Sequence, residues 1–291
     1  MNTSLKEYYE QFESFAAVQK KYGTSYYLAT LFFPKKIKEA TFALYAWVRI
    51  PDEIVDTAEG RGVEESRVLL QAWRTSWESA HKNKSSEIKN HDAVQKIFHT
   101  YNIPYEYSTA FLNAMEQDLT QERYQDYKAL ENYMYGSAAV VGLIMSHIIG
   151  YRDGALPYAV KLGEAMQLTN FIRDIDEDFV ERGRIYMPLD DLQKYHIEAK
   201  DIAEKNTEKL QPFLVDYIKK TDALYHSSMP GIHLLKSGKF SVLFAHNLYR
   251  AILRKIEKNN YDVFSGKLRT NEYDKGIILI KTLWQLLIKR Y

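Results

Sequence analysis

The chain has 291 residues, of which 46% are hydrophobic and 26% charged, the balance of a water-soluble globular protein. Its formal net charge of +1 gives no electrostatic footprint for nucleic acid, so no nucleic-acid partner is expected. The absence of cysteine excludes disulfides and zinc–thiolate sites and fits a cytoplasmic location. No signal peptide and no run of about 18 apolar residues is visible, so no spanning helix is expected.

Helical periodicity dominates the whole chain. Apolar residues recur at helical spacing almost everywhere, strand alternation is nearly absent, and glycine and proline are few, at 13 and 7 residues. This pattern predicts an all-α protein of about ten to twelve helices, folded as a single domain over residues 1–291, with a loop at 81–92. The 23 tyrosines indicate either a core rich in large residues or a cavity lined with amphipathic rings.

The first polar cluster lies in the segment that ends in "VRIPDEIVD". Its side chains Tyr45, Arg49, Asp52 and Asp56 are spaced 4, 3 and 4, so they share one helix face. Such a stripe is commonly solvated, but residues 38–50 are apolar on nearly every side. Carboxylates on a buried helix are costly unless a cation satisfies them. Pro51 suggests that the helix kinks or restarts just before Asp52.

A second cluster repeats this arrangement. Gln167, Asn170, Asp174 and Asp178 are spaced 3, 4 and 4 and also share a helix face. Residues 176–177 are acidic but fall off the stripe, so they are expected to be ordinary solvated acids. Two carboxylate rows without histidine or cysteine suit Mg²⁺, which typically combines a few carboxylates with substrate phosphate oxygens.

Arginines accompany both rows, and arginine binds phosphate bidentately. Arg49 lies in the first row, Arg173 in the second, and Arg182 and Arg184 follow the second, where surface solvation is the alternative interpretation. Together these features favour metal-assisted ionisation of an allylic diphosphate beside an aromatic cavity. Tyrosine faces can stabilise the carbocation that results.

Four segments, in order along the chain, resemble the squalene/phytoene synthase family, the head-to-head class of trans-prenyl synthases. The longest joins the second acid row to an R-G-R-x-Y-x-P element and is the most specific. The segments are "GTSYYLATLFFP" (23–34), "ALYAWVRIPDEIVD" (43–56), "ENYMYGSAAVVGLIM" (131–145) and "LGEAMQLTNFIRDIDEDFVERGRIYMP" (162–188).

The resemblance implies the isoprenoid synthase fold, with helices around a central apolar cavity and the two aspartate motifs facing each other at its mouth. It also implies two to three Mg²⁺ ions, bound together with substrate diphosphate. The implied roles are metal binding for Asp52, Asp56, Asn170, Asp174 and Asp178; substrate binding for Tyr22, Gly23, Thr24, Ser25, Tyr45, Arg49, Gln167, Arg173, Arg184 and Tyr249; and catalysis for Tyr45, Arg49, Tyr133 and Tyr249.

The implied reaction joins two prenyl diphosphates through a cyclopropylcarbinyl diphosphate. We favour two geranylgeranyl diphosphates giving phytoene, as in carotenoid biosynthesis. The alternatives are squalene or dehydrosqualene formation from farnesyl diphosphate and, in another class, a non-catalytic helical assembly factor. No nicotinamide motif is visible, but relatives that use NADPH lack one too, so NADPH is neither expected nor excluded.

Some positions depart from the pattern of the family. Glu53 stands where many relatives carry a second Asp, Gly23 and Thr24 replace part of a serine motif, and Ala139 stands where an A-G pair is common. None of these changes removes an implied metal ligand, so we expect activity.

Three further expectations concern substrate length, assembly and location. Tyr26 and Thr30 share a helix face, and a small residue at a cavity wall would leave room for the longer, 20-carbon substrate. The protein is expected to be a monomer or a homodimer. The segment "GIILIKTLWQLLIKRY" (276–291) combines apolar residues with Lys281, Lys289 and Arg290, which predicts peripheral membrane contact; a final core helix is the alternative.

Overall fold

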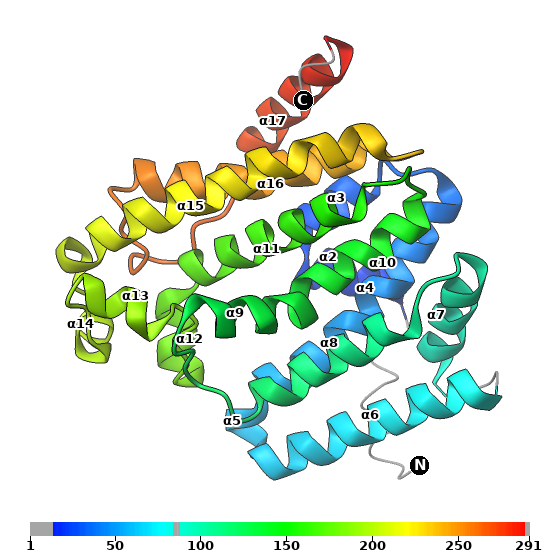
Figure 1. Cartoon of the computed structure of the whole chain (residues 1–291), viewed down its shortest axis with the longest axis horizontal. Helices are drawn as coiled ribbons and strands as arrows, with labels where there is room; N and C mark the ends of the chain where they lie inside the picture. The colour runs from blue at the N-terminus through cyan, green and yellow to red at the C-terminus, as the bar shows by residue number, and fades with distance from the viewer. Residues whose placement is uncertain (1–13, 84–85, 87, 289–291) are drawn as a thin grey trace.

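The structure, a computed structural model, describes residues 14–83, 86 and 88–288. Within these residues the chain forms sixteen α-helices and one π-helix and no strand, only two isolated β-bridges (Figure 1). The elements are α2 Phe15–Tyr22, α3 Thr24–Thr30, α4 Lys35–Asp56, α5 Ala58–Arg61, α6 Val63–Asn83, α7 Lys89–Thr100, α8 Tyr105–Asp118, α9 Tyr127–Met134, η1 Tyr135–Ala139, α10 Val140–Ile149, α11 Leu156–Arg173, α12 Ile175–Arg182, α13 Leu189–Lys194, α14 Ala199–Ala203, α15 Thr207–Leu234, α16 Lys239–Lys258 and α17 Glu272–Leu287.

The all-α prediction is confirmed, with differences in detail. The helices outnumber the predicted ten to twelve because four of them, α3, α5, α13 and α14, have only four to seven residues. The loop predicted at 81–92 is shorter, since α6 continues to Asn83 and α7 begins at Lys89. That residues 1–291 form one domain stays a prediction.

Helix α4 does not restart at Pro51. It runs unbroken over 22 residues, with the proline inside it. Pro51 removes one backbone hydrogen bond, but Ile50, Ile54 and Val55 around it are all at most 2% exposed. Burial of these side chains outweighs the lost bond, so one continuous helix carries the whole first acid row.

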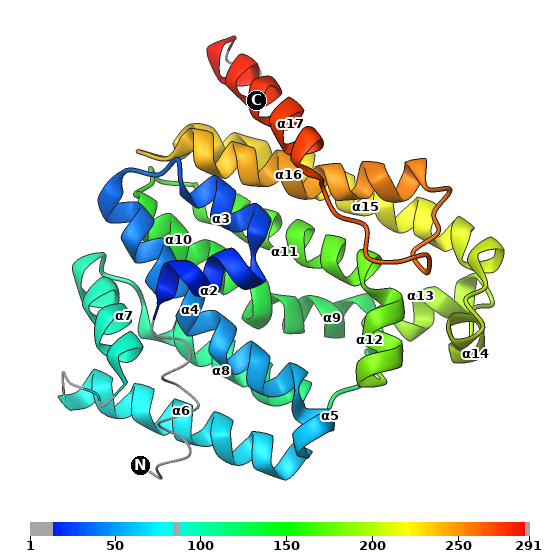
Figure 2. The ribbon, with the colours of Figure 1, turned by 180° about the vertical axis from the view of Figure 1, so that it is seen from behind.

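Helix α11 lies in the middle of the molecule, next to α15, α10, η1 and α16 (Figures 1 and 2). Small residues allow this close contact. A Cβ atom added at Gly163 would lie 2.9 Å from the carbonyl oxygen of Ala138, and one at Gly142 would lie 2.9 Å from that of Ala159. Helix α11 carries the second acid row at its C-terminal end, so these contacts fix where that row lies.

The π-helix η1 lies between α9 and α10, within the segment 131–145 that resembles the family. Gly136 lies in it and faces α8, where an added Cβ would approach the carbonyl oxygen of Ala110 to 2.7 Å. Single-turn π-helices are frequent at functional sites because they redirect the side chains around them. Here Ser137 and Ala138 line the central cavity.

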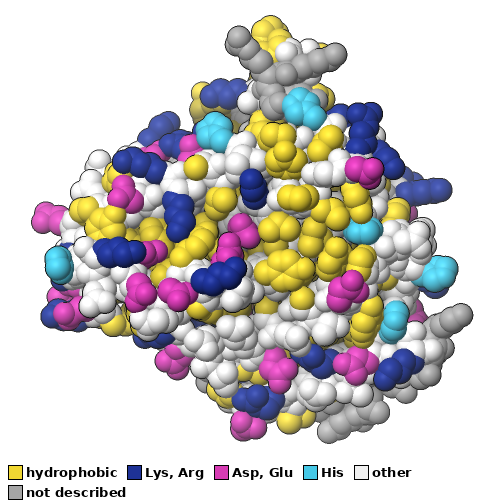
Figure 3. Space-filling model, viewed as in Figure 1, with side chains coloured by type: hydrophobic (Ala, Val, Ile, Leu, Met, Phe, Trp, Pro, Cys, Tyr) yellow, Lys and Arg dark blue, Asp and Glu magenta, His cyan; other side chains and the backbone are white. Residues whose placement is uncertain are grey.

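The surface seen in Figure 3 exposes apolar side chains across its middle, with acidic and basic side chains intermixed around them. Among the described residues, no helix combines the length and the apolar character needed to cross a membrane.

Candidate active site

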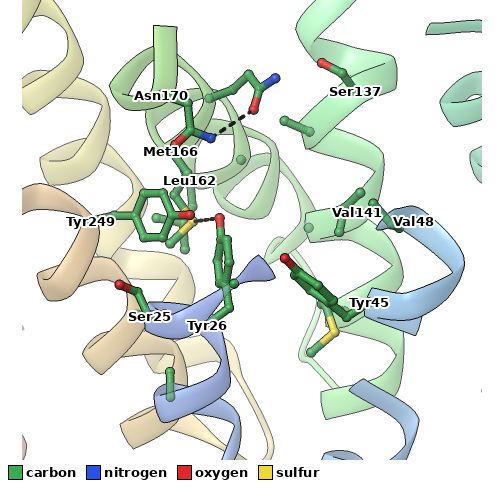
Figure 4. A pocket seen from close by; sticks show the side chains of 18 of the residues that line it. Ser25, Tyr26, Tyr45, Val48, Ser137, Val141, Leu162, Met166, Asn170 and Tyr249 are labelled. Carbon is green, nitrogen blue, oxygen red and sulfur yellow. Dashed lines mark hydrogen bonds between the residues drawn. The ribbon is translucent and has the colours of Figure 1, made fainter. Parts of the chain in front are cut away.

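A cavity of about 810 Å³ lies between α4, α10, α11 and α16. Both ends of α11 line it, Tyr158 near one end and Arg173 at the other, so the cavity follows the helix for roughly 22 Å at 1.5 Å per residue. Acidic and basic side chains together line the end near Asp174. The rest is lined largely by apolar side chains such as Val141, Leu162 and Met166 (Figure 4). The shape suits a long apolar chain with a charged head.

Nearly all of the sequence-predicted site residues line this one cavity. These are Tyr22, Gly23, Thr24, Ser25, Tyr45, Arg49, Asp52, Asp56, Tyr133, Gln167, Asn170, Arg173, Asp174, Asp178 and Tyr249. The exception is Arg184, a predicted substrate-binding residue, which is 7% exposed and does not line the cavity, although its guanidinium lies 4.0 Å from the carboxylate of Asp56. Its guanidinium donates to the hydroxyl of Tyr186 and to the backbone oxygen of Asp118, at 3.1 and 2.8 Å.

The first acid row lies on the cavity face of α4 rather than in solvent. Arg49 donates to Asp52 and to Glu53, the second contact at 2.5 Å, and lies 3.7 Å from Asp56. The Arg49 guanidinium also lies over the ring of Tyr22, 4.6 Å from its centroid. Arg49 therefore contacts both acids of the first row and also the neighbouring Glu53.

Gly23 brings the N-terminal segment against this row. A Cβ atom at Gly23 would lie 2.5 Å from the hydroxyl oxygen of Tyr45. Glycine lets the turn between α2 and α3 come this close to α4 without displacing the Tyr45 side chain. The residue that departs from the serine pattern thus has a steric reason in this chain.

The second acid row continues across a helix break. Helix α11 ends at Arg173 and α12 begins at Ile175, with Asp174 between them. The backbone N–H groups of Asp174 and Asp178 still donate to the oxygens four residues earlier, each at 2.8 Å. The break therefore keeps the helical spacing, and the predicted stripe stays on one face.

The two rows face each other across the mouth of the cavity. Arg182 shows this directly, since it reaches Asp56 of the first row and Asp178 of the second, each at 3.2 Å. Its side chain is 14% exposed, so the surface interpretation of Arg182 is wrong. The Arg182 guanidinium thus lies between a carboxylate of α4 and one of α12, where two negative charges would otherwise repel each other.

Burial and mutual repulsion disfavour the ionised form of one acid in each row, Asp56 and Asp178. Burial, with the charge on Asp52, raises the pKa of Asp56 to about 6. Burial, with the charge on Asp174, raises the pKa of Asp178 well above its usual value. A divalent cation between the rows would reverse both effects.

The donor set fits Mg²⁺ completed by a diphosphate rather than a closed protein cage. Among the described residues, no three acids or histidines converge on one point as a ready metal site. The side-chain oxygen of Asn170 lies buried without a hydrogen-bond partner, as expected of a ligand that awaits its cation. Carboxylate and amide oxygens with room for phosphate are the environment that Mg²⁺ prefers.

Glu177 was expected to be an ordinary solvated acid, and this expectation is wrong. Its carboxylate lines the cavity and accepts a 2.6 Å hydrogen bond from Lys267. Lys267 also lies 3.4 Å from Asp174, and it reaches the site from the loop after α16. Asp176, by contrast, points away from the cavity and pairs with Lys205 at 2.8 Å.

Sequence reasoning also missed Asp118, the last residue of α8. It lines the cavity, is 6% exposed, and accepts hydrogen bonds from Tyr133 and Tyr186. Burial raises its pKa to about 7. Periodicity offered a signal, since Asp118 falls on the buried face that Phe111 and Met115 define. Lys267 offered none, because it lies in an irregular loop 90 residues from its partner Glu177.

Three tyrosines stand inside the cavity beside the acid rows (Figure 4). The ring centroids of Tyr26 and Tyr249 are 4.7 Å apart, and those of Tyr26 and Tyr45 are 6.5 Å apart. The Tyr26 hydroxyl donates to the sulfur of Met166 at 3.4 Å. These side chains place electron-rich ring faces close to where charge would develop.

Fold and site together define an all-α enzyme with two facing aspartate rows at the mouth of a long apolar cavity. The family model for squalene/phytoene synthase matches residues 19–274, and the chain belongs to this family. It is therefore a prenyltransferase, and the alternative of a non-catalytic assembly factor is not supported.

Individual relatives agree with this assignment. The chain is 33% identical over 268 residues to a phytoene synthase of Thermus thermophilus, covering 91% of this chain and 89% of the relative. It is 30% identical over 273 residues to the 15-cis-phytoene synthase of Synechocystis, covering 89% and 80%. A solved dehydrosqualene synthase in complex with ligand superposes with a TM-score of 0.86 at 26% identity, covering 98% of this chain and 99% of the other.

Proposed function

We propose that this cavity joins two geranylgeranyl diphosphates head to head and releases phytoene. The observation that carries the proposal is the pair of acid rows, bridged by Arg182, at one end of an apolar cavity that follows α11. The relatives named phytoene synthase support the 20-carbon substrate. Asp118 and Glu177 join the proposed site beside the residues predicted from sequence.

In the first half-reaction, one diphosphate leaves and the double bond of the second substrate attacks the resulting allylic cation. A proton is then lost as the cyclopropane ring closes. Arg49, Arg173 and Lys267 hold diphosphate oxygens at the mouth. Two to three Mg²⁺ ions, held by Asp52, Asp56, Asn170, Asp174 and Asp178, would supply positive charge that stabilises the leaving group.

In the second half-reaction the cyclopropylcarbinyl diphosphate ionises, rearranges and loses a proton. Tyr26, Tyr45 and Tyr249 present ring faces that stabilise the cations. Asp118 holds the hydroxyl of Tyr133 and so fixes the orientation of that ring at the cavity wall. Because the proposed reaction ends in proton loss, no hydride donor is needed, and NADPH is not required.

Farnesyl diphosphate remains the second candidate substrate, because a dehydrosqualene synthase superposes along nearly the whole chain. Incubation of the purified protein with Mg²⁺ and either radiolabelled diphosphate separates the two. We expect a 40-carbon hydrocarbon from geranylgeranyl diphosphate as the main organic-phase product. A 30-carbon hydrocarbon in excess under competition would transfer the assignment to the shorter substrate.

Thr30→Phe is expected to shift the product ratio toward 30 carbons. Thr30 is 2% exposed by residue, lines the cavity on the same helix face as Tyr26, and accepts a 3.2 Å hydrogen bond from Gln19. A phenyl ring there removes cavity volume that the longer chain needs. Thr30→Val, which loses the hydroxyl without adding length, is the control. An unchanged ratio in competition assays of Thr30→Phe would remove Thr30 as the determinant of chain length.

Mg²⁺ is expected to raise the thermal midpoint more at pH 8 than at pH 5. The pKa of Asp56 is raised to about 6, so this carboxyl is mainly neutral at pH 5 and charged at pH 8. Without metal, the contribution of Asp56 to the free energy of unfolding falls as pH rises from about 4 to 6, because its carboxyl binds the proton more tightly in the folded state than in the unfolded state. Differential scanning fluorimetry with Mg²⁺ and with EDTA measures the difference. An equal shift at both pH values would argue against ion binding at these carboxylates.

We further propose a cytoplasmic protein, a monomer or a homodimer, that contacts membranes peripherally. The prenyl chains of the substrates and the apolar product that we propose support membrane contact, since both partition into lipid. Of the basic residues named for this contact, Lys289 and Arg290 lie outside the described residues.

A further inference from the structure

One acid of the cavity wall differs from the others in how it is held. Six acidic side chains line the cavity, and five of them lie within 4.0 Å of an arginine or lysine side chain. These five are Asp52, Asp56, Asp174, Glu177 and Asp178. The sixth is Asp118, whose carboxylate has no such ion pair in the part of the chain that the structure describes. Arg184 donates to the backbone oxygen of Asp118 instead, at 2.8 Å.

Two tyrosine hydroxyls hold the Asp118 carboxylate. Tyr133 donates to one of its oxygens and Tyr186 to the other, the second at 3.3 Å. Arg184 fixes Tyr186 in turn, since it donates to the Tyr186 hydroxyl at 3.1 Å. The rings of Tyr133 and Tyr186 stack with their centroids 5.6 Å apart. A neutral hydrogen-bond donor orients a carboxylate without cancelling its charge, so Asp118 is still able to accept a proton.

This environment suits a base that works at neutral pH. Burial raises the pKa of the Asp118 carboxyl to about 7. A general base is most effective when its pKa lies near the working pH, because it is then partly ionised and still binds a proton well. The acids of the two rows are less suited, since a bound cation stabilises their ionised form and lowers their basicity.

Asp118 also lies at the end of the cavity where protons are lost. In the proposed reaction, ring closure takes a proton from the first carbon of the ionised chain, and the final double bond joins the first carbons of both chains. These carbons carry the diphosphates in the substrates, so they are held near the acid rows. Arg184 connects the two places, because it contacts the backbone of Asp118 and lies 4.0 Å from Asp56 of the first row. Tyr133 lines the cavity beside Asp118.

We propose that Asp118 takes up the proton lost in each half-reaction, by way of the Tyr133 hydroxyl. This inference rests on the proposed function and adds a base to it, whereas the orientation of Tyr133 alone requires only a hydrogen-bond acceptor. As the carbon–hydrogen bond breaks, its electron pair forms the ring bond in the first half-reaction and the central double bond in the second. The proton binds to the Tyr133 oxygen while the hydroxyl proton of Tyr133 moves to Asp118. The diphosphate released in the same half-reaction then carries a proton away, which restores the carboxylate.

Asp118→Asn separates proton uptake from orientation. The asparagine amide oxygen still accepts a hydrogen bond from Tyr133, but it is not a base. With geranylgeranyl diphosphate and saturating Mg²⁺, we expect hydrocarbon formation to fall about 100-fold or more, with little change in KM. Ionised chains that do not lose a proton are captured by water, so prenyl alcohols appear and the diphosphate released exceeds two per hydrocarbon. A coupled diphosphate assay and mass spectrometry of the organic phase give this ratio, which does not depend on how much of the variant is folded.

Two further variants complete the test. Glu116→Gln is the matched control, because Glu116 lies on the same helix, α8, but is 47% exposed, pairs with Arg74 and does not line the cavity. It is expected to keep wild-type turnover and two diphosphates per hydrocarbon. Tyr133→Phe removes the relay hydroxyl and is expected to release the same excess of diphosphate as Asp118→Asn. Because both groups act on one proton, combining the two changes should reduce hydrocarbon formation little more than the larger single effect.

Two results would overturn the inference. One is a ratio of two diphosphates per hydrocarbon in Asp118→Asn, since proton loss would then not depend on its carboxylate and the diphosphate itself would be the base. The other is a double variant whose loss equals the product of the two single losses, which would show that Tyr133 and Asp118 act independently. A wild-type protein that forms no hydrocarbon from either prenyl diphosphate would instead contradict the proposed function.

Discussion

Asp52→Asn and Asp174→Asn are each expected to reduce turnover by orders of magnitude while leaving the helical fold intact. Each change removes one negative charge from an acid row and keeps the shape of the side chain. The two residues stand on opposite rows at the mouth of the cavity, so loss of either weakens the assembly of metal and diphosphate on which ionisation depends. Arg49 still has Glu53 as a partner when Asp52 is replaced, so α4 should not unfold.

The measurement is product formation at limiting Mg²⁺, with circular dichroism as the check on folding. Glu181→Gln is the matched control, because Glu181 lies on α12 between Asp178 and Arg182 but is 62% exposed and does not line the cavity. It is expected to retain near-normal activity. Near-normal product formation by Asp52→Asn or Asp174→Asn under the same conditions would count decisively against the metal assignment.

Gly163→Ala is expected to destabilise the protein by about 1–3 kcal/mol and to lower activity, although it adds a single methyl group. The added Cβ would lie 2.9 Å from the carbonyl oxygen of Ala138 and 3.0 Å from the Cα of Ala139. Both neighbours are backbone atoms, so α11 itself has to move away from η1. Because α11 carries Gln167 and Asn170 into the cavity, this shift would also displace part of the second row.

Gly276→Ala is the matched control for this prediction. Gly276 is also inside a helix, α17, but nothing lies within 4 Å of an added Cβ there. Alanine favours helix over glycine by up to about 1 kcal/mol, so this change should be neutral or stabilising. Chemical denaturation of both variants in the absence of lipid gives the comparison. Equal effects of the two substitutions would contradict the claim that close contact at Gly163 positions α11.

Spacing predicted the acid rows because a helix repeats its faces regularly. Asp52 and Asp56 lie on the cavity face of α4 and Asn170, Asp174 and Asp178 on that of α11 and α12, as the 3- and 4-residue intervals indicate. The resemblance to a known family predicted that the rows face each other. No local pattern carries that information, since α4 and α12 are more than 100 residues apart.

The sequence could not predict contacts made by irregular segments. It also could not predict where the burial of neighbouring side chains outweighs a local helix-breaking residue. Lys267 reaches Glu177 from a loop, where no periodicity constrains direction. Pro51 was expected to make the helix kink or restart just before Asp52, but α4 does not restart there, and the side chains around the proline are buried. Helix α17 was predicted to be either core or membrane contact, whereas its two faces differ, one packed on α16 and the other exposed. Which face is buried depends on where α16 lies in the tertiary structure, and the local sequence pattern does not specify that position.

The central claim is that the two acid rows ionise prenyl diphosphates so that two molecules join head to head. It is tested most directly by incubating the protein with geranylgeranyl diphosphate and Mg²⁺, without NADPH, and analysing the organic phase by mass spectrometry. The account predicts a 40-carbon hydrocarbon formed by proton loss, with two hydrogens fewer than the product of hydride addition, and two diphosphates released for each molecule. Recovery of unchanged substrate or of geranylgeraniol alone, with Mg²⁺ saturating, would contradict it.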